Sequence, residues 1–388
     1  MGAPNISIMF APVTPSPVLN VQRIDAHLLV APVAAPVRNS FRVLTERNAL
    51  LVQVTDADGT SGWGEIWCNY PPGAARHRMT LLQQVVAPML TGKSFTDPAA
   101  AYRLLEQSLR IPALQCGEPG SFAQVAAGVD VALWDLAARK LGQPLWQWLG
   151  GSPVLQVYAS GLGPEQPQNI AAKKIEEGYR AVKLKVGFGH DVDVANVRKL
   201  RTVVGANGAV MLDANQRWNV GDAVAAAGAF ADQHPLWLEE PIAADEPVEQ
   251  WRTLARQTPV ALAAGENLRG AANFSALISS GAVCAIQPDI GKWGGFTGCL
   301  EVARCATDAG VLFCPHWLGG GVGLLASLHL LGAAGAAGWG EIDANANGLR
   351  EDFLFSGFDV VEGRLTLNDA PGLGFAPDVD LLERYRAK

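Results

Sequence analysis

Seven side chains capable of acid–base or metal chemistry recur at nearly constant spacing in the second half of this sequence. Each ends an apolar stretch: Lys185, Asp213, Glu239, Glu266, Asp289, His316 and Glu341. Neighbours in this series are 23 to 28 residues apart, about the length of one strand, one helix and two loops. Repeated strand–helix units form a barrel whose strand ends meet at one mouth. The spacing therefore predicts a metal-assisted proton-transfer site at that mouth.

Three carboxylates form the candidate metal site. Asp213, Glu239 and Glu266 end successive predicted strands, so we expect them to face one another. Such carboxylates repel unless a proton or a hard cation lies between them, and oxygen-only ligation suits Mg²⁺ or Mn²⁺. The alternative is that each acidic residue caps the following helix. Asn215 should face the same way as Asp213 and could bind a substrate hydroxyl, whereas Glu240 should point away from Glu239.

Basic residues are expected on opposite sides of the mouth. Lys183 and Lys185 are two residues apart in a predicted strand, so both side chains should enter the barrel interior. Two ammoniums packed near a cation should have lowered pKa values, which would make one a base. Asp289 and His316 end adjacent predicted strands, where the carboxylate could orient the imidazole, although a lone histidine is often only a core residue.

Two further residues are candidates at the mouth. Glu341 ends the eighth predicted strand, and Lys292 lies three residues after Asp289. Lys292 could equally be a solvated loop lysine.

Eight strands would position these residues. We expect them at residues 155–160, 181–185, 210–215, 236–240, 260–266, 285–289, 311–316 and 339–343. Helical patterns lie between them, for example at 169–177 and 274–280. No helical pattern follows the eighth strand, and residues 358–368 resemble strands, so we expect the tail to return to the first domain.

The preceding region predicts an α+β domain. A strand near residues 24–30 and a hairpin at 50–55 and 62–66 come first, followed by helical patterns over 78–109 and 123–141. The expected organisation is a loose extension at 1–20, a capping domain at 21–150, a barrel at 151–350 and a C-terminal return at 351–388.

Composition excludes several classes of protein. The 388 residues are 49% hydrophobic and 17% charged, which fits about two globular domains. A net charge of −7 without dense basic runs argues against a nucleic-acid partner. Six cysteines without CxxC pairs, and no charged segment typical of a signal peptide, favour a reducing cytoplasm. Residues 319–340 are uncharged, but their glycines and His329 favour a buried helix over a membrane span.

Taken together, these motifs resemble the enolase superfamily, and within it the mandelate racemase type. The resemblance covers the chain from about Val21 to its end. The motifs are Lys183-Leu-Lys185, Asp213-Ala-Asn215, Trp237-Leu-Glu-Glu-Pro241, Gly265-Glu-Asn267, Pro288-Asp289, Lys292-Trp-Gly-Gly295, Pro315-His316 and Glu341. The resemblance implies an α/β fold, a modified (β/α)₇β TIM barrel capped by an α+β domain built from both chain ends.

The resemblance also implies roles for the site residues. One Mg²⁺ per subunit, with Mn²⁺ as a substitute, would be held by Asp213, Glu239 and Glu266. Lys185 would be the base on one face of the substrate, and His316, paired with Asp289, would act on the other. Lys183 and Glu341 would help to stabilise an enediolate, Glu341 as a hydrogen-bond donor if it is protonated.

Among the activities of such a family, we expect dehydration of an aldonic or aldaric acid to a 2-keto-3-deoxy acid. A racemase or epimerase of a 2-hydroxy acid is the alternative, and a non-catalytic metal-binding scaffold is a third possibility. Cycloisomerases and dipeptide epimerases resemble this layout but carry a lysine where Asp289 stands. The expected partners are a small-molecule carboxylate and further copies of the chain, from dimer to octamer, with neither nucleic acid nor membrane.

Substrate specificity should come from loops of the capping domain that close over the mouth. The candidates are Arg38, Asn39 and Arg42 in one loop, Trp67, Asn69 and Tyr70 in the next, and Trp293 and Trp317 beside the Asp–His pair. The arginines could bind a distal carboxylate or could lie in solvent.

Overall fold

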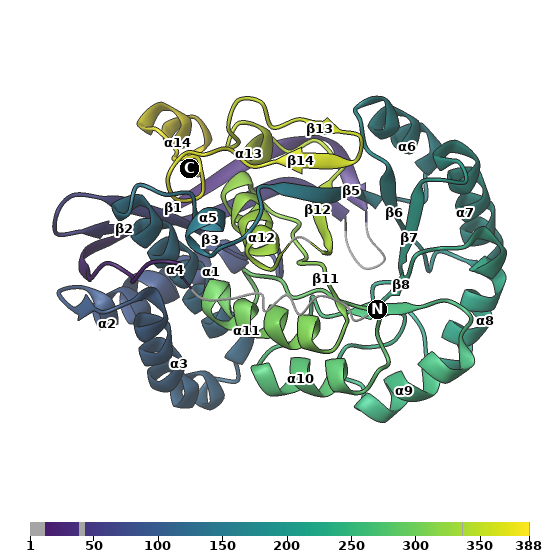
Figure 1. Cartoon of the computed structure of the whole chain (residues 1–388), viewed down its shortest axis with the longest axis horizontal. Helices are drawn as coiled ribbons and strands as arrows, with labels where there is room; N and C mark the ends of the chain where they lie inside the picture. The colour runs from purple at the N-terminus through teal and green to yellow at the C-terminus, as the bar shows by residue number, and fades with distance from the viewer. Residues whose placement is uncertain (1–11, 39–42, 336, 388) are drawn as a thin grey trace, which may run out of the picture.

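The structure, a computed structural model, describes residues 12–38, 43–335 and 337–387. A capping domain with an antiparallel sheet packs beside a larger domain of parallel strands ringed by helices (Figure 1). This arrangement agrees with the α/β class and the two-domain organisation expected from the sequence. The numerical domain boundaries remain predictions.

The capping sheet has the strand order β3-β2-β1-β4. Its strands are β1 (Leu19–Arg38), β2 (Val43–Asp56), β3 (Ser61–Ile66) and β4 (Ser94–Phe95), and its helices are α1 (Ala74–Leu81), the π-helical turn η1 (Leu82–Val86), α2 (Ala87–Leu90), α3 (Pro98–Gln115), α4 (Pro119–Lys140) and α5 (Leu145–Trp148). The prediction of one helical region over residues 78–109 is wrong between α2 and α3, where the chain leaves the helical conformation. Gly92 adopts a left-handed φ of 76°, and Asp97 starts a new helix by accepting the Ala100 amide at 2.7 Å.

Strand β3 lies unusually close to the buried helix α4. A β-carbon added at Gly62 would lie 2.2 Å from the Ala132 carbonyl, and one at Gly64 would lie 2.1 Å from the Gly128 carbonyl. Only glycine permits this approach, because any side chain would collide with the helix backbone. The contact fixes the position of β3, which also carries Glu65 towards the barrel domain.

In its described residues, the barrel domain contains eight parallel strands and seven intervening helices. Figure 1 shows the helices on the outside of the strands. The strands are β5 (Val154–Leu162), β6 (Ala181–Lys185), β7 (Ala209–Asp213), β8 (Leu238–Glu239), β9 (Leu262–Ala264), β10 (Ala285–Ile286), β11 (Leu312–Phe313) and β12 (Trp339–Asp343). The helices are α6 (Pro167–Glu176), α7 (His190–Val204), α8 (Val220–Phe230) with the short turn η2 (Ala231–Gln233), α9 (Val248–Gln257), α10 (Ala271–Ser279), α11 (Gly295–Asp308) and α12 (Gly321–Ala333).

These strands pair in chain order from β5 to β11, and β12 joins β5 from the other side. A buried interior cluster that includes Tyr158, Met211 and Trp237 packs beneath the strand ends. The observed β8, β9, β10 and β11 are shorter than expected, because the regular pairing ends before the reactive residues. Asp289 and His316 still form an isolated parallel bridge beyond β10 and β11.

The C-terminal segment contacts both domains. After α13 (Gly348–Glu351), strands β13 (Val360–Val361) and β14 (Arg364–Thr366) form a hairpin, and β14 pairs with β5 of the barrel. Helix α14 (Val379–Tyr385) then precedes a bridge between Arg386 and Leu29 of β1. The tail therefore pairs with the barrel sheet first and then reaches the capping domain, as the sequence predicted.

Within the uncharged segment 319–340, residues 321–333 form the buried helix α12 and residues 339–340 begin β12, and a buried helix is what the sequence predicted. Across the described parts of the chain, no helix combines the length and the apolar character needed to cross a membrane.

Candidate active site

Strand β6 brings two lysines into the interior of the barrel domain. Lys183 is completely buried, and its Nζ lies 2.7 and 2.9 Å from the two carboxylate oxygens of Glu239. The same ammonium lies 2.8 Å from Glu341 Oε1. Lys185 donates a hydrogen bond to Asp213 Oδ2. The two-residue strand period therefore places both lysines among the predicted carboxylates.

The expected lowering of the lysine pKa values is wrong for this arrangement. Burial alone would lower the pKa of Lys183, but Glu239 and Glu341 raise it well above its usual value. Burial alone would likewise lower the pKa of Lys185, but the neighbouring Asp213 carboxylate raises it above its usual value. Both lysines are therefore ammonium ions in this structure, because each lies beside a carboxylate.

The three predicted metal ligands lie on neighbouring strand ends. Asp213 ends β7 and is paired in register with Glu239, which ends β8, while Glu266 follows β9 by two residues. All three are buried. Asn215 has a left-handed φ of 45° and contacts Asp213 through its backbone N–H at 2.8 Å and its Nδ2 at 3.3 Å. It therefore orients this carboxylate directly.

The carboxylates do not converge as a ligand set. Within the described residues, no group of three or more histidine, cysteine, aspartate or glutamate side chains is arranged to hold a metal ion. The reason is that each carboxylate pairs with the nearest cationic group: Asp213 with Lys185, Glu239 with Lys183, and Glu266 with His316. The expectation that they face one common point is therefore not met by these side-chain conformations.

The composition of the cluster nevertheless fits a hard divalent cation. Six buried carboxyl groups share it with three lysines and one histidine: Asp213, Glu239, Glu240, Glu266, Asp289 and Glu341, with Lys183, Lys185, Lys292 and His316. Burial, and repulsion from the neighbouring carboxylates, raise the pKa of Glu239 to about 7 and that of Glu240 to about 8. An oxygen-rich donor set in which carboxyl groups outnumber the cationic side chains matches the ligand preference of Mg²⁺ and Mn²⁺.

His316 is held between two carboxylates. Its Nδ1 lies 2.7 Å from Asp289 Oδ2, and its Nε2 lies 2.6 Å from Glu266 Oε2. Burial alone would lower the pKa of the imidazole, but Glu266, Glu341 and Asp289 raise it to about 10. Asp289 accepts the backbone N–H groups of Gly291 and Lys292 at 2.9 and 3.1 Å, which fixes its orientation. His316 is thus a protonated imidazolium with a fixed Nδ1 partner.

Glu341 is an acceptor and not a donor in this structure. Burial alone would raise its pKa, but Lys183 and His316 lower it to about 2. Its oxygens accept hydrogen bonds from the Ser160 hydroxyl and from the Trp317 backbone N–H at 3.3 Å. The expectation that Glu341 donates as a protonated acid is therefore wrong here, because adjacent cations stabilise its charge.

Lys292 belongs to the site and is not a solvated loop lysine. Its Nζ lies 3.0 Å from Asn267 Oδ1 and 3.7 Å from Glu266 Oε1, and it stands 5.1 Å from the centre of the Trp67 ring. Trp67 itself lies 5.8 Å from the Tyr70 ring. The second capping loop therefore reaches the edge of the cluster.

The structure describes some of the other predicted specificity residues only in part, or not at all. Trp317 is buried, and its indole N–H donates to the Gly320 carbonyl at 2.9 Å, so it packs inside the site wall. Arg38 is the last residue of β1, and the structure describes its backbone only. Asn39 and Arg42 lie outside the described residues. The proposed role of the arginines stays a prediction.

Two residues of the cluster were missed by sequence reasoning. Gln287 is completely buried and donates to Glu239 Oε2 at 2.7 Å, and Ser160 donates to Glu341. Gln287 is two residues before Asp289, so the strand period could have placed it on the same face. Ser160 ends the first predicted strand, but its residue type gave no signal, because serine is common in strands and turns.

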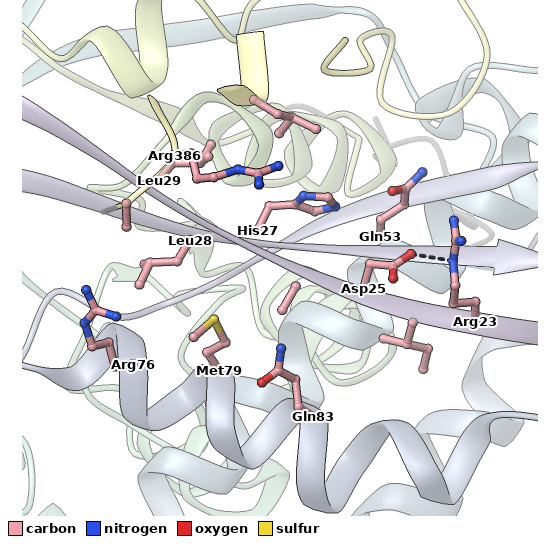
Figure 2. Close-up of a pocket in the computed structure, with 14 residues that line it drawn as sticks. Arg23, Asp25, His27, Leu28, Leu29, Gln53, Arg76, Met79, Gln83 and Arg386 are labelled. Atoms are coloured by element: carbon pink, nitrogen blue, oxygen red, sulfur yellow. Dashed lines mark ion pairs between the residues drawn. The ribbon is translucent and has the colours of Figure 1, made fainter. Parts of the chain in front are cut away.

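A groove of about 580 Å³ lies elsewhere, on the capping domain, between β1, α1 and the C-terminal tail (Figure 2). His27, Gln53, Gln83 and Arg386 are among its lining residues, and Arg23 pairs with Asp25 at 2.7 Å. None of the predicted site residues lines it. The groove is thus separate from the carboxylate–lysine cluster.

The two domains match two family models. Residues 23–150 match the mandelate racemase / muconate lactonizing enzyme N-terminal domain, and residues 168–381 match the enolase C-terminal domain-like family. The chain belongs to the enolase superfamily. The family expected from the motifs is therefore confirmed, together with its mandelate racemase / muconate lactonizing enzyme branch.

Solved structures of this superfamily resemble the whole chain. A mandelate racemase/muconate lactonizing enzyme from Bordetella bronchiseptica is 46% identical, with a TM-score of 0.90 over 95% of this chain and 99% of that chain. A racemase from Streptomyces coelicolor with bound magnesium is 26% identical, with a TM-score of 0.84 over 95% of this chain and 100% of that chain.

Curated relatives carry more than one activity. A D-galactarolactone cycloisomerase from Agrobacterium fabrum is 28% identical over 95% of this chain and 99% of its own length. A D-galactonate dehydratase from Verminephrobacter eiseniae is 29% identical over 72% of this chain and 74% of its own length. This member of the enolase superfamily is an enzyme, and its relatives include isomerases as well as lyases.

Proposed function

We propose that this enzyme removes the proton α to a substrate carboxylate and dehydrates an aldonic or aldaric acid to a 2-keto-3-deoxy acid. The observation that carries the proposal is the placement of Lys185 and the His316–Asp289 pair in one buried, carboxylate-rich cluster. Lys185 comes from β6 and His316 from the segment after β11, so they enter the cluster from different sides. Two separate proton-transfer groups are what an elimination requires.

Electrostatics explains why such a cluster suits this chemistry. Loss of an α-proton places a second negative charge on a carboxylate that already carries one, so the deprotonated form needs cationic neighbours. Lys183 provides a permanently charged ammonium beneath the site. Asp213, Glu239 and Glu266 would hold Mg²⁺ or Mn²⁺, which when bound supplies Lewis-acid stabilisation of the developing charge.

Lys185 must be neutral before it can accept a proton. Its contact with Asp213 favours the ammonium form, so Asp213 has to release Lys185 for the base to form. The predicted role of Asp213 as a metal ligand would draw this carboxylate away from the lysine. Lys185 Nζ would then accept the α-proton of the substrate.

His316 is suited to act as the acid. It is protonated, and Asp289 holds its Nδ1, so Nε2–H is the proton available for transfer. Transfer of this proton to the β-hydroxyl lets the C–O bond break and water leave, and the resulting enol tautomerises to the 2-keto-3-deoxy acid. Transfer of the same proton to the α-carbon would instead give a racemase or epimerase, which remains the competing activity.

The proposal is tested by proton NMR in D₂O with Mg²⁺ and pooled aldonic, aldaric and uronic acids. Loss of an α-proton signal with new methylene signals is expected, and the reaction should disappear in Lys185→Met. Lys199→Met, which changes an exposed lysine of α7, is the matched control and should keep full activity.

Other outcomes identify the alternatives. Exchange of the α-proton with all hydroxyls retained means racemisation or epimerisation. Ring opening of a lactone added to the pool, with no loss of water, means cycloisomerisation, the activity named for the Agrobacterium relative. Binding of Mg²⁺ without any exchange across the pool would favour a non-catalytic scaffold. Assembly from dimer to octamer and a cytoplasmic location remain predictions.

A further inference from the structure

Alternate residues of one extended capping segment all contact the loops that carry the His316–Asp289 pair. The segment begins in β3 and continues beyond its end, so residues 65, 67 and 69 point towards the barrel domain. Glu65 contacts the segment after His316, Trp67 contacts the segment after Asp289, and Asn69 contacts Leu318. The three contacts therefore lie on the chain segments that directly follow Asp289 and His316.

Glu65 makes the most specific of these contacts. Its Oε1 accepts the Gly320 N–H at 2.6 Å, and its Oε2 accepts the Gly323 N–H at 2.9 Å. These amides lie at the start of α12, whose N-cap residue, Gly320, provides no side-chain cap. A carboxylate from the capping domain therefore caps a barrel helix, where the partial positive charge of the helix end also favours an anion.

The surrounding glycines show how closely the parts fit. A β-carbon added at Gly320 would lie 2.7 Å from Glu65 Oε2, and one at Gly323 would lie 1.9 Å from the Trp317 ring. A side chain at either position would displace the carboxylate or the indole. The backbone N–H of Trp317 donates to Glu341, and His316 is the preceding residue. Any shift of this segment would therefore move His316 as well.

Trp67 and Asn69 extend the contact. A β-carbon at Gly291 would lie 3.3 Å from Trp67 Cβ, so the capping segment also packs against the turn that orients Asp289. Asn69 donates to the Leu318 carbonyl at 2.7 Å. In contrast, Lys185 and its partner Asp213 lie on the barrel strands β6 and β7.

We propose that Glu65, supported by Trp67 and Asn69, is a positioning residue for the His316–Asp289 pair. The capping domain thereby holds the acid of the reaction in place, whereas the base Lys185 is positioned by the barrel alone. This inference rests on the proposed function for its catalytic consequence and on the contacts of residues 316–323 for its structural part. Tilting the segment should affect proton delivery by His316 more than proton removal by Lys185.

The test compares Glu65→Gln with Asp135→Asn. Glutamine keeps the size of the side chain but turns an NH₂ group towards one of the two amides, so one hydrogen bond is lost. Asp135 is also a buried carboxylate that accepts two backbone N–H groups, from Trp63 and Leu373. It pairs in addition with Arg139 at 2.7 Å, and none of these contacts involves residues 316–323. It therefore controls for general loss of stability.

Hydrogen–deuterium exchange gives the readout that needs no substrate. Glu65→Gln should raise amide exchange in residues 316–323 by about 10-fold or more relative to Asp135→Asn, because one of the two hydrogen bonds to the start of α12 is lost. Glu65→Asp should give an intermediate value. Unchanged exchange at these residues in Glu65→Gln would overturn the inference.

The kinetic readout separates the two faces of the site. Glu65→Gln should slow dehydration by about 10- to 100-fold, since small displacements of a catalytic group have effects of this size, while α-proton exchange stays within about 3-fold of wild type. Equal losses in both reactions would overturn the positioning role. If the wild-type enzyme turns over no acid, the proposed function fails, and amide exchange alone decides the structural part.

Discussion

Replacing Asp289 by asparagine should disable the His316 face and leave the Lys185 face working. Asp289 Oδ1 accepts two backbone N–H groups, from Gly291 at 2.9 Å and Lys292 at 3.1 Å. Asparagine must keep its oxygen at these donors, so its NH₂ group will face His316 Nδ1. This NH₂ group cannot accept a hydrogen bond from the Nδ1–H of an imidazolium. The neutral tautomer of His316, which carries its proton on Nε2, therefore becomes favoured.

The size of the effect follows from the lost contact. A buried hydrogen bond to a charged group contributes about 1.5 to 3 kcal/mol, which corresponds to about 10- to 100-fold in rate. Dehydration should fall by at least this factor in Asp289→Asn. The pKa of His316 should also fall from about 10, so the loss of activity at high pH, where the imidazolium deprotonates, should begin at a lower pH.

The assay follows dehydration and α-proton exchange in the same D₂O reaction for wild type, Asp289→Asn, His316→Asn and the double variant. We expect exchange catalysed by Lys185 to change by less than about 3-fold, and we expect the double variant to be little worse than His316→Asn, because the two residues act as one unit. Additive losses, or equal losses in both reactions, would refute this reasoning. Thermal melting checks that each variant is folded.

Three further predictions concern stability and metal. Arg47→Met removes the cation 2.8 Å from buried Asp343 and should lower the free energy of unfolding by about 3 kcal/mol in urea denaturation. The control Arg252→Met removes an exposed ion pair and should lower it by less than about 1 kcal/mol. Burial lowers the pKa of His329 to about 3, so the unfolded chain binds the extra proton between about pH 6.5 and 3, and stability should fall with decreasing pH in that window. His329→Gln should reduce this slope by up to about 1.4 kcal/mol per pH unit in denaturation series at pH 4 to 7, and an unchanged slope would contradict the assignment. Mg²⁺ should raise the melting temperature of wild type but have little effect on Glu239→Gln, and an equal rise in both would argue against Glu239 as a ligand.

Much of the active site could be predicted because strands have a two-residue period and barrels repeat at a constant interval. The period placed Lys183 and Lys185 on one face, and the interval placed Asp213, Glu239 and His316 at strand ends that meet. These relations depend on backbone geometry alone, so they do not require knowledge of side-chain contacts.

Side-chain pairing could not be predicted in the same way. The sequence indicated carboxylates around one point, but the structure pairs Glu239 with Lys183 and Glu266 with His316. Which oppositely charged neighbour a buried carboxylate contacts depends on distances of a few ångströms between strands, and the Coulomb energy of burial changes steeply over such distances. The raised lysine pKa values and the ionised Glu341 follow from these pairings.

The sequence by itself therefore determined the family, the order of barrel strands and the residue types that line the mouth. Only the tertiary structure decided that Glu65 caps α12 from another domain, across 255 positions in the chain. No local pattern encodes this contact, because it arises from the approach of β3 to α4 and from the packing of the capping sheet on the barrel. Local periodicity decides the direction in which a side chain points, whereas the packing of the domains decides which residues it contacts.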